Sequence, residues 1–174
     1  MKKIGLISNN KNHKAINIAH EIYNFLKGRK TEVFLLSGDT MPVKFNLPAV
    51  SVKDLSAEID FLISVGGDGT FLRSARYCFE RQIPVMGINV GNLGFLAEID
   101  IKDYKTAIKN LLDGKFGIEE RMLLELRIIR EGKKIESLSS PLIALNEFII
   151  SRNTMGKILE IEVIVNDYSF LLFR

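Results

Sequence analysis

The sequence predicts an α/β domain built on a parallel sheet, followed by part of an antiparallel, β-rich domain. Through residues 1–100, short apolar runs alternate with segments of helical periodicity. The apolar runs are continuous, which indicates strands covered on both faces, as in parallel sheets. After residue 100 one amphipathic helix follows, and the apolar period then becomes two, which is typical of antiparallel strands. We therefore expect a first domain over residues 1–100, then a linker helix and an incomplete all-β domain over 101–174.

The first domain is expected to begin with a strand, a helix and a second strand. The apolar run Ile4–Ile7 predicts the first strand, because polar residues follow it at once. Apolar residues recur at helical spacing over residues 18–26, and Gly28 marks the end of that helix. The run Val33–Leu36 predicts the second strand, and residues 47–50 predict a further short one.

The next strand leads directly into a glycine-rich loop. Phe61–Val65 is an apolar run of the buried type, and residues 66–70 read Gly-Gly-Asp-Gly-Thr. A helical segment over residues 71–79 follows the loop, and Pro84–Ile88 predicts another strand. Because the loop joins a strand to a helix, we expect it at the carboxyl edge of a Rossmann-like sheet, where such sheets bind ligands.

The second region has a different pattern. Tyr104–Leu112 has the spacing of one amphipathic helix, and residues 124–128 and 159–165 alternate apolar with polar. Asn166-Asp167 has the composition of a hairpin turn. An apolar run then reaches the last residues, 170–174. Since an exposed apolar edge strand favours aggregation, we expect the sequence to be a C-terminally truncated piece that stops inside its second domain.

Composition excludes several classes of protein. The 174 residues carry 24 Lys and Arg against 21 Asp and Glu, a net charge of +3, and 47% are apolar, which is ordinary for a globular protein. The basic residues are spread along the chain, so we expect no nucleic-acid partner. No apolar run approaches the roughly 18 residues of a membrane span. The single cysteine, Cys78, is expected to be a buried hydrophobe in a cytoplasmic protein.

The glycine-rich loop is the sharpest chemical signal. Glycines let a backbone approach a ligand closely, and the free N–H groups at a helix start favour phosphate. The alternative is that Asp68 or Thr70 merely caps the following helix. Taken as a phosphate loop, the segment supplies five candidate binding residues: Gly66, Gly67, Asp68, Gly69 and Thr70.

Asp68 needs a reason to lie beside phosphate, because like charges repel. It could hold a Mg²⁺ ion that neutralises the phosphates, or it could accept the proton of an attacking hydroxyl group. A helix start favours the ionised form of Asp68. We therefore expect a weak base, for which positioning the hydroxyl group matters more than removing its proton.

Two further segments are candidates for the same site. The stretch over residues 87–96 contains three glycines and Asn89, and we expect it to line the same cleft as the loop. An ordinary turn is an equal alternative. Asn146 and Glu147 are polar residues inside an apolar run, so they need partners. Sugar hydroxyls and backbone groups would serve equally well.

These motifs together resemble the NAD kinase family. The Gly66–Thr70 loop, the segment Gly87–Phe95 and Leu145-Asn146-Glu147 come in the order and approximate spacing of that family, over essentially the whole chain. The loop alone is shared with diacylglycerol and sphingosine kinases and, with Ser for Thr, with phosphofructokinases. The other two motifs narrow the resemblance to NAD kinase.

The resemblance implies a phosphofructokinase-like nucleotide-binding domain that transfers the terminal phosphoryl group of ATP to NAD. In some members polyphosphate is the donor, and the acceptor is the 2′-hydroxyl of the adenosine ribose, which gives NADP. ATP with Mg²⁺ would be the cofactors and NAD the substrate. A homo-oligomer, dimer or tetramer, is the expected assembly of the full-length protein, with no membrane partner.

The resemblance also implies roles for single residues. Asp68 would activate the 2′-hydroxyl, Asn146 and Glu147 would hold hydroxyls of an NAD ribose, and Phe95 would lie near the adenine. The other expected contacts with the nucleotides are Arg73, Asn89, Lys157 and Arg174. Taken without the resemblance, Arg73 and Lys157 are better interpreted as solvated surface charges.

The sequence departs from the family at its end. The family continues with an Asp-Gly element and a Thr-Pro-Thr-Gly-Ser-type stretch, and neither is present before residue 174. We therefore expect little or no activity from the 174-residue chain. Two alternatives stay open: a lipid kinase of the diacylglycerol type and a non-catalytic nucleotide-binding module.

Overall fold

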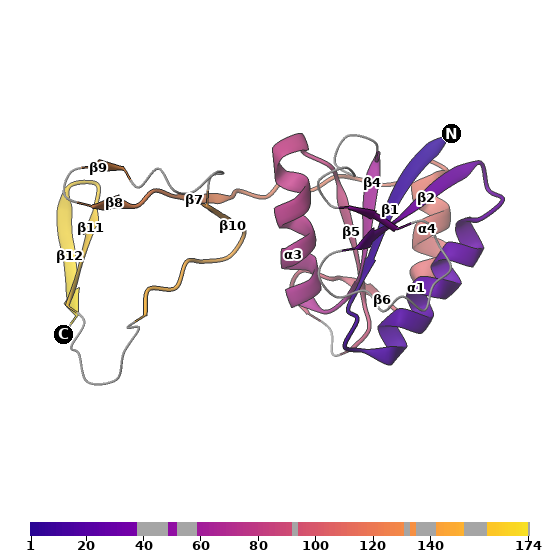
Figure 1. Ribbon diagram of the computed structural model, residues 1–174, viewed down its shortest axis with the longest axis horizontal. Coiled ribbons are helices and arrows are strands. Elements are labelled where there is room, and N and C mark those ends of the chain that lie inside the picture. The colour runs from indigo at the N-terminus through magenta and orange to yellow at the C-terminus, as the bar shows by residue number, and fades with distance from the viewer. Residues whose placement is uncertain are drawn as a thin grey trace. The chain divides into compact units, whose positions relative to one another are not determined.

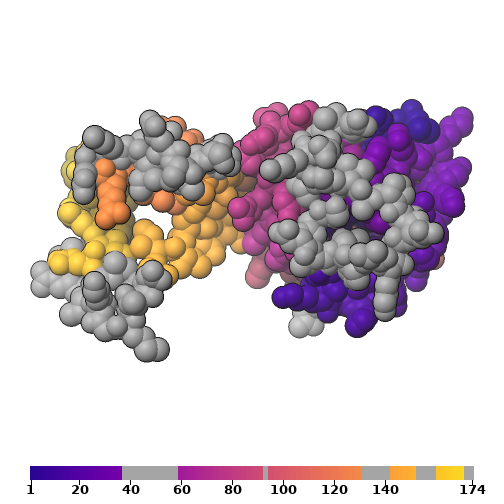
Figure 2. Space-filling model, in the orientation of Figure 1, coloured from indigo at the N-terminus to yellow at the C-terminus, as the bar shows by residue number. Residues whose placement is uncertain are grey.

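The computed structural model divides the chain into two compact units, Met1–Met122 and Leu123–Arg174. The two units are coloured from indigo to orange and from orange to yellow in the space-filling view (Figure 2). The structure describes seven ranges: residues 1–37, 49–51, 59–91, 94–130, 133–134, 142–151 and 160–173.

The first unit is built on a parallel sheet of six strands (Figure 1). Every neighbouring pair is parallel, which confirms the α/β fold class. Two short strands, β3 and β6, form its edges. In spatial order the strands are β3 (Ala49–Ser51), β2 (Thr31–Ser37), β1 (Lys2–Ser8), β4 (Phe61–Gly66), β5 (Val85–Asn89) and β6 (Ile99–Asp100).

Helices cover both faces of this sheet (Figure 1). Helices α1 (His13–Leu26) and α4 (Tyr104–Leu112) pack on one face, and α3 (Asp68–Cys78) with the short 3₁₀ helix η1 (Phe79–Arg81) packs on the other. The larger core cluster includes Ile4, Leu6, Ile18, Ile22, Leu26, Ile63, Val65, Ile88, Ile108 and Leu111. The smaller cluster comprises Ile7, Leu36, Ile59, Leu62 and Cys78. Burial raises the pKa of the Cys78 thiol to about 12, which confirms Cys78 as a buried hydrophobe.

Helix α1 ends before Gly28, as the sequence predicts, and it begins at His13, after an Asn12 cap. The side-chain oxygen of Asn12 accepts hydrogen bonds from the backbone N–H groups of Lys14 and Ala15, at 2.9 and 3.2 Å. These bonds satisfy two donors that the first turn leaves open. Gly28 follows the helix with φ of +89°, a conformation that favours glycine.

Helix α4 belongs to the first unit, so the division expected after residue 100 moves to residue 122. Its apolar face completes the larger core cluster. The ammonium group of Lys2 donates to the carbonyl oxygens of Leu111 and Leu112 at 2.7 and 2.9 Å, where a helix carries partial negative charge. The Tyr104 hydroxyl donates to Glu21 of α1 at 2.6 Å. These contacts fasten α4 to the sheet and to α1.

Helix α3 is joined to the sheet by a buried polar pair. The Ser74 hydroxyl lies 2.9 Å from the Ser64 hydroxyl on β4 and 2.8 Å from the Thr70 carbonyl oxygen. Both serines are buried. Since buried polar groups need partners, this pair fixes how α3 sits on the strand that carries the glycine loop.

We expect Ser74→Ala to lower the free energy of unfolding by about 1–3 kcal/mol, because it leaves the buried Ser64 hydroxyl without its partner. Thermal and urea denaturation measure this. Replacing both serines by Ala should cost less than the sum of the two single changes. Strictly additive effects would show that the two hydroxyls do not interact.

The second unit contains antiparallel pairs, as the change of period predicts. Among its described residues, β7 (Leu124–Leu126) pairs with β10 (Leu142–Ala144) and β8 (Ile129–Arg130) pairs with β9 (Lys133–Lys134). Strands β11 (Ile161–Val165) and β12 (Tyr168–Phe173) form the predicted hairpin. Its turn residues, Asn166 and Asp167, have φ of 49° and 67°, which is the left-handed pair that a type I′ turn requires.

Within the described ranges, no helix combines the length and the apolar character that crossing a bilayer requires.

Candidate active site

The candidate site lies where the order of the strands reverses. Strands β1 and β4 are neighbours at the centre of the sheet, and the chain leaves them toward opposite edges. Ligands of such sheets bind beyond the carboxyl ends of the strands at this point. The backbone N–H of Asn9, just after β1, donates to the Val65 carbonyl at 2.9 Å and fixes the two strand ends together.

The glycine loop forms a tight junction between β4 and α3. Gly66 ends the strand, and a Cβ atom placed there would collide with the Thr70 hydroxyl. Gly67 is the N-cap of α3, with φ of −100° and ψ of −170°, and no side chain caps the helix. Asp68 is the first helical residue, three positions before the predicted helix start. The alternative in which Asp68 or Thr70 serves only as a cap is therefore wrong.

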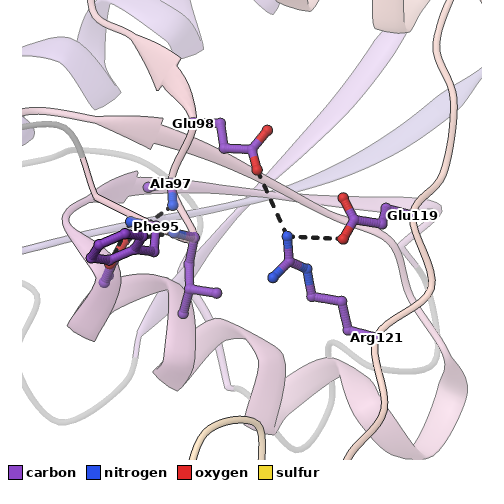
Figure 3. Close-up of polar contacts among 7 residues, drawn as sticks. Phe95, Ala97, Glu98, Glu119 and Arg121 are labelled. Carbon is purple, nitrogen blue, oxygen red and sulfur yellow. Dashed lines mark hydrogen bonds and ion pairs between the residues drawn. The ribbon is translucent and has the colours of Figure 1, made fainter.

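The Asp68 carboxylate instead accepts backbone N–H groups of a distant segment, residues 95–97. Figure 3 labels Phe95 and Ala97 of this segment. The N–H of Phe95 donates to Oδ2 at 2.9 Å, and the N–H groups of Leu96 and Ala97 donate to Oδ1 at 3.1 Å each. The bonds from Ala97 and Phe95 are the largest causes of a lowered pKa at Asp68, with a smaller contribution from Leu96, and partial burial opposes them. These donors favour the ionised carboxylate, and Asp68 also lies in the first turn of α3, where a helix favours negative charge.

Gly94 allows this close approach. A Cβ atom built on Gly94 would overlap the Asp68 carboxylate, with Oδ1, Cγ and Oδ2 as its three nearest atoms. By contrast, the nearest atom to a Cβ on Gly91 is the Asn89 side-chain oxygen at 3.9 Å. Only a glycine at position 94 lets residues 95–97 reach the carboxylate in this geometry.

Asn89 is a buried residue that contacts the Asp68-binding segment at Ala97. It ends β5, is only 3% exposed, and pairs in register with Gly66. Its Nδ2 donates to the Ala97 carbonyl at 3.3 Å, and its Oδ1 accepts from the Gly91 N–H at 2.9 Å. The structure thus brings the two glycine-rich stretches together, as the sequence predicts, and engages the Asn89 amide in backbone contacts.

Phe95 and Arg73 differ in exposure. The Phe95 ring is 92% exposed while its N–H is bonded to Asp68, so an aromatic face is displayed beside the carboxylate. Arg73 lies on α3, and its Nε is buried with no hydrogen-bond partner among the described residues. A buried guanidinium nitrogen without a partner suits an anionic group.

An ion-pair group follows the Asp68-binding segment. Glu98 comes directly after Ala97, and Arg121 lies between Glu98 and Glu119 (Figure 3), with Nη2–Oε1 distances of 3.7 and 2.9 Å. All three side chains are at least 40% exposed, so the pairs contribute at most about 1 kcal/mol each. Sequence reasoning missed this group and the backbone donors of residues 95–97.

The remaining predicted residues are not part of this geometry. Asn146 and Glu147 belong to the second unit, where both are exposed and follow β10. Lys157 and Arg174 lie outside the described residues. The roles expected for these four residues stay predictions.

The acidic and metal-binding side chains of the described residues are dispersed. None of their His, Cys, Asp and Glu side chains make a group of three or more that could hold a metal ion. The Asp68 carboxylate is surrounded by N–H donors, whose positive ends repel a cation.

Comparison with known proteins points to one family. A family model described as the ATP-NAD kinase N-terminal domain matches residues 4–116. The NAD kinase of Acetivibrio thermocellus is 34% identical over 172 residues, which cover 96% of this chain and 56% of the relative. The NAD kinase of Natranaerobius thermophilus is 33% identical over 162 residues, which cover 93% and 55%. The chain thus spans little more than half the length of these relatives.

A solved structure confirms the fold. The crystal structure of yeast NADH kinase complexed with NADH matches with a TM-score of 0.62 and 18% sequence identity. The match covers 83% of this chain and 46% of the yeast chain.

Proposed function

The chain belongs to the ATP-NAD kinase family, and from this premise we propose that the protein that contains it phosphorylates NAD. The terminal phosphoryl group of ATP, or of polyphosphate, passes to the 2′-hydroxyl of the adenosine ribose and gives NADP. The observation that carries the proposal is the Asp68 carboxylate at the start of α3, which accepts three backbone N–H groups. It lies at the carboxyl edge of the sheet, where the strand order reverses.

The chemistry proposed for Asp68 is orientation of the attacking hydroxyl group. The ribose hydroxyl donates a hydrogen bond to the carboxylate, and its oxygen attacks the γ-phosphorus as the bond to the β-phosphate oxygen breaks. The hydroxyl proton passes to Asp68 late, because a carboxyl group with a lowered pKa is a weak base. ADP leaves, and the new phosphate ester is NADP.

The glycine loop and its surroundings would bind the nucleotides. Gly66–Thr70 lets phosphate approach the N–H groups at the start of α3. The buried Nε of Arg73 supports an anionic contact at this helix. The exposed ring of Phe95 offers a surface on which an adenine can stack. Mg²⁺ would arrive on the phosphates of ATP, because this ion keeps several waters and needs few protein ligands.

Asn146, Glu147, Lys157 and Arg174 complete the proposed NAD contacts, as expected from the resemblance. The cytoplasmic location and the homo-oligomeric assembly stay predictions. The buried thiol of Cys78 is consistent with a reducing compartment.

The proposal is tested with the product of the complete reading frame that contains residues 1–174. The purified protein is given ATP and Mg²⁺ with NAD in one reaction and with diacylglycerol vesicles in another. We expect NADP, measured with an NADP-specific dehydrogenase, and no phosphorylated lipid. Lipid phosphorylation without NADP would replace the proposal with a lipid kinase, and no transfer to either acceptor would leave a non-catalytic binding module. The same assay on the 174-residue chain should show little or no turnover.

A further inference from the structure

The segment 94–97 is held from two sides by side chains at the ends of neighbouring strands. Asp68, after β4, accepts the N–H groups of Phe95, Leu96 and Ala97. Asn89, at the end of β5, donates to the carbonyl oxygen of Ala97. The backbone of Ala97 therefore bonds both side chains: its N–H donates to Asp68, and its carbonyl oxygen accepts from Asn89.

Further hydrogen bonds hold the Asn89 side chain and the end of β5 in place. Its other bond, from the Gly91 N–H to Oδ1, is the local turn that Asn side chains form with the backbone two residues on. The next residue, Val90, donates its N–H to the Gly66 carbonyl at 3.1 Å, so the end of β5 is bonded to the start of the glycine loop. Burial of the Asn89 amide makes the loss of its partners costly.

Packing supports the same arrangement. A Cβ atom on Gly87, in the middle of β5, would lie 2.8 Å from the Phe71 ring and 2.9 Å from the Ala97 Cα. Strand β5 therefore contacts Ala97 through its backbone at Gly87 and through the amide of Asn89. A larger residue at position 87 would therefore displace Ala97.

We propose that Asn89 is a positioning residue for Asp68: it holds Ala97, and through Ala97 it sets the place of the carboxylate. This differs from the direct contact with a nucleotide that the sequence predicts, because the amide oxygen and amino group are both engaged with backbone. The consequence for phosphoryl transfer rests on the proposed function, while the consequence for the Asp68 carboxyl group does not.

The informative variant is Asn89→Ser. A Ser hydroxyl is able to accept from the N–H two residues on, so the turn at Gly91 is kept, but it is too short to reach the Ala97 carbonyl. The change adds no charge. Thr31→Val is the matched control, because it also removes a partly buried hydrogen bond in this unit, from the Thr31 hydroxyl to the Leu26 carbonyl at 2.7 Å, but changes neither α3 nor the segment 94–97.

The direct readout is the titration of the Asp68 carboxyl carbon by NMR in the 174-residue chain, with the signal assigned by its loss in Asp68→Asn. We expect the pKa of Asp68 to rise toward its ordinary value in Asn89→Ser and to stay at the wild-type value in Thr31→Val. The bond from the Ala97 N–H lowers the Asp68 pKa most, so the Asp68 pKa should respond when Ala97 loses its bond to Asn89.

The second readout is the rate of NADP formation by the complete protein. We expect kcat to fall roughly three- to tenfold in Asn89→Ser, with a smaller change in KM for NAD, as loss of one hydrogen bond would give. An unchanged Asp68 pKa in a folded variant would overturn the inference. Failure of both Asn89→Ser and Asn89→Ala to fold would also overturn it, because Asn89 would then serve the fold and not the carboxylate. If Asn89→Ser shifts the Asp68 pKa but the complete wild-type protein makes no NADP, the proposed function is rejected and the positioning role of Asn89 stands.

Discussion

Replacing Asp68 by Asn is expected to lower the rate of NAD phosphorylation about 10²–10⁴-fold in the complete protein. An amide is neutral, so it cannot accept the hydroxyl proton. Its NH₂ group would also face a backbone N–H where the carboxylate now accepts a bond. Steady-state assays with ATP, Mg²⁺ and NAD measure the effect, which should fall mainly on kcat.

Asp60→Asn is the matched control for this experiment. The Asp60 carboxylate also accepts a backbone N–H, from Lys3 at 2.7 Å, but it precedes β4 and so lies at the amino end of that strand. We expect wild-type kcat and KM from this variant. An Asp68→Asn protein that made NADP at the wild-type rate would remove Asp68 from the mechanism.

Gly94→Ala is expected to have the largest effect on the geometry of the site. The added methyl group would overlap the Asp68 carboxylate, so the segment 94–97 and Asp68 must separate, and the three N–H bonds weaken. We expect a loss of about 1–3 kcal/mol in the free energy of unfolding at pH 7, as overpacking usually gives. Urea denaturation followed by circular dichroism measures this. Gly91→Ala, where the new Cβ meets nothing closer than 3.9 Å, should be nearly neutral.

The effect of Gly94→Ala should depend on pH. The pKa of Asp68 is lowered in the folded protein, so its bonds contribute stability that is present above the unfolded-state pKa. That contribution is lost as pH falls through the folded-state pKa. The stability difference between wild type and Gly94→Ala should therefore be larger at pH 7 than in acid. An equal difference at both pH values would show that the glycine serves packing and not the carboxylate.

The position of the glycine loop could be predicted from sequence because its surroundings have strong patterns. The loop lies between a continuous apolar strand, Phe61–Val65, and a helical segment. In a parallel sheet such a junction lies at the carboxyl edge. The Asn166-Asp167 turn could be predicted for a similar reason, since few residue pairs adopt the left-handed conformation at both positions.

The partner of Asp68 could not be predicted in the same way. Its three donors are backbone N–H groups, which every residue except proline carries, so no side chain marks them. The only sequence feature that indicates this contact is Gly94, because a glycine often marks a place where another group approaches the backbone closely. The two-residue strand β6 (Ile99–Asp100) is too short to show a period. The division between the units lies at residue 122 and not near residue 100, because Lys2 bonds the end of α4, a contact between residues far apart in sequence that no local pattern shows.

The order of the strands has a consequence for how the site forms during folding. Strands β1 and β2 pair across a single helix, whereas β1 and β4 pair Ile4 with Phe61, after β2 and β3 have intervened. Contacts between residues far apart in sequence form more slowly, because a longer loop must close first. We therefore expect β1, α1 and β2 to assemble before the glycine loop takes its final shape. During synthesis the three N–H donors of Asp68 would become available only after β5 and the segment 94–97 have left the ribosome.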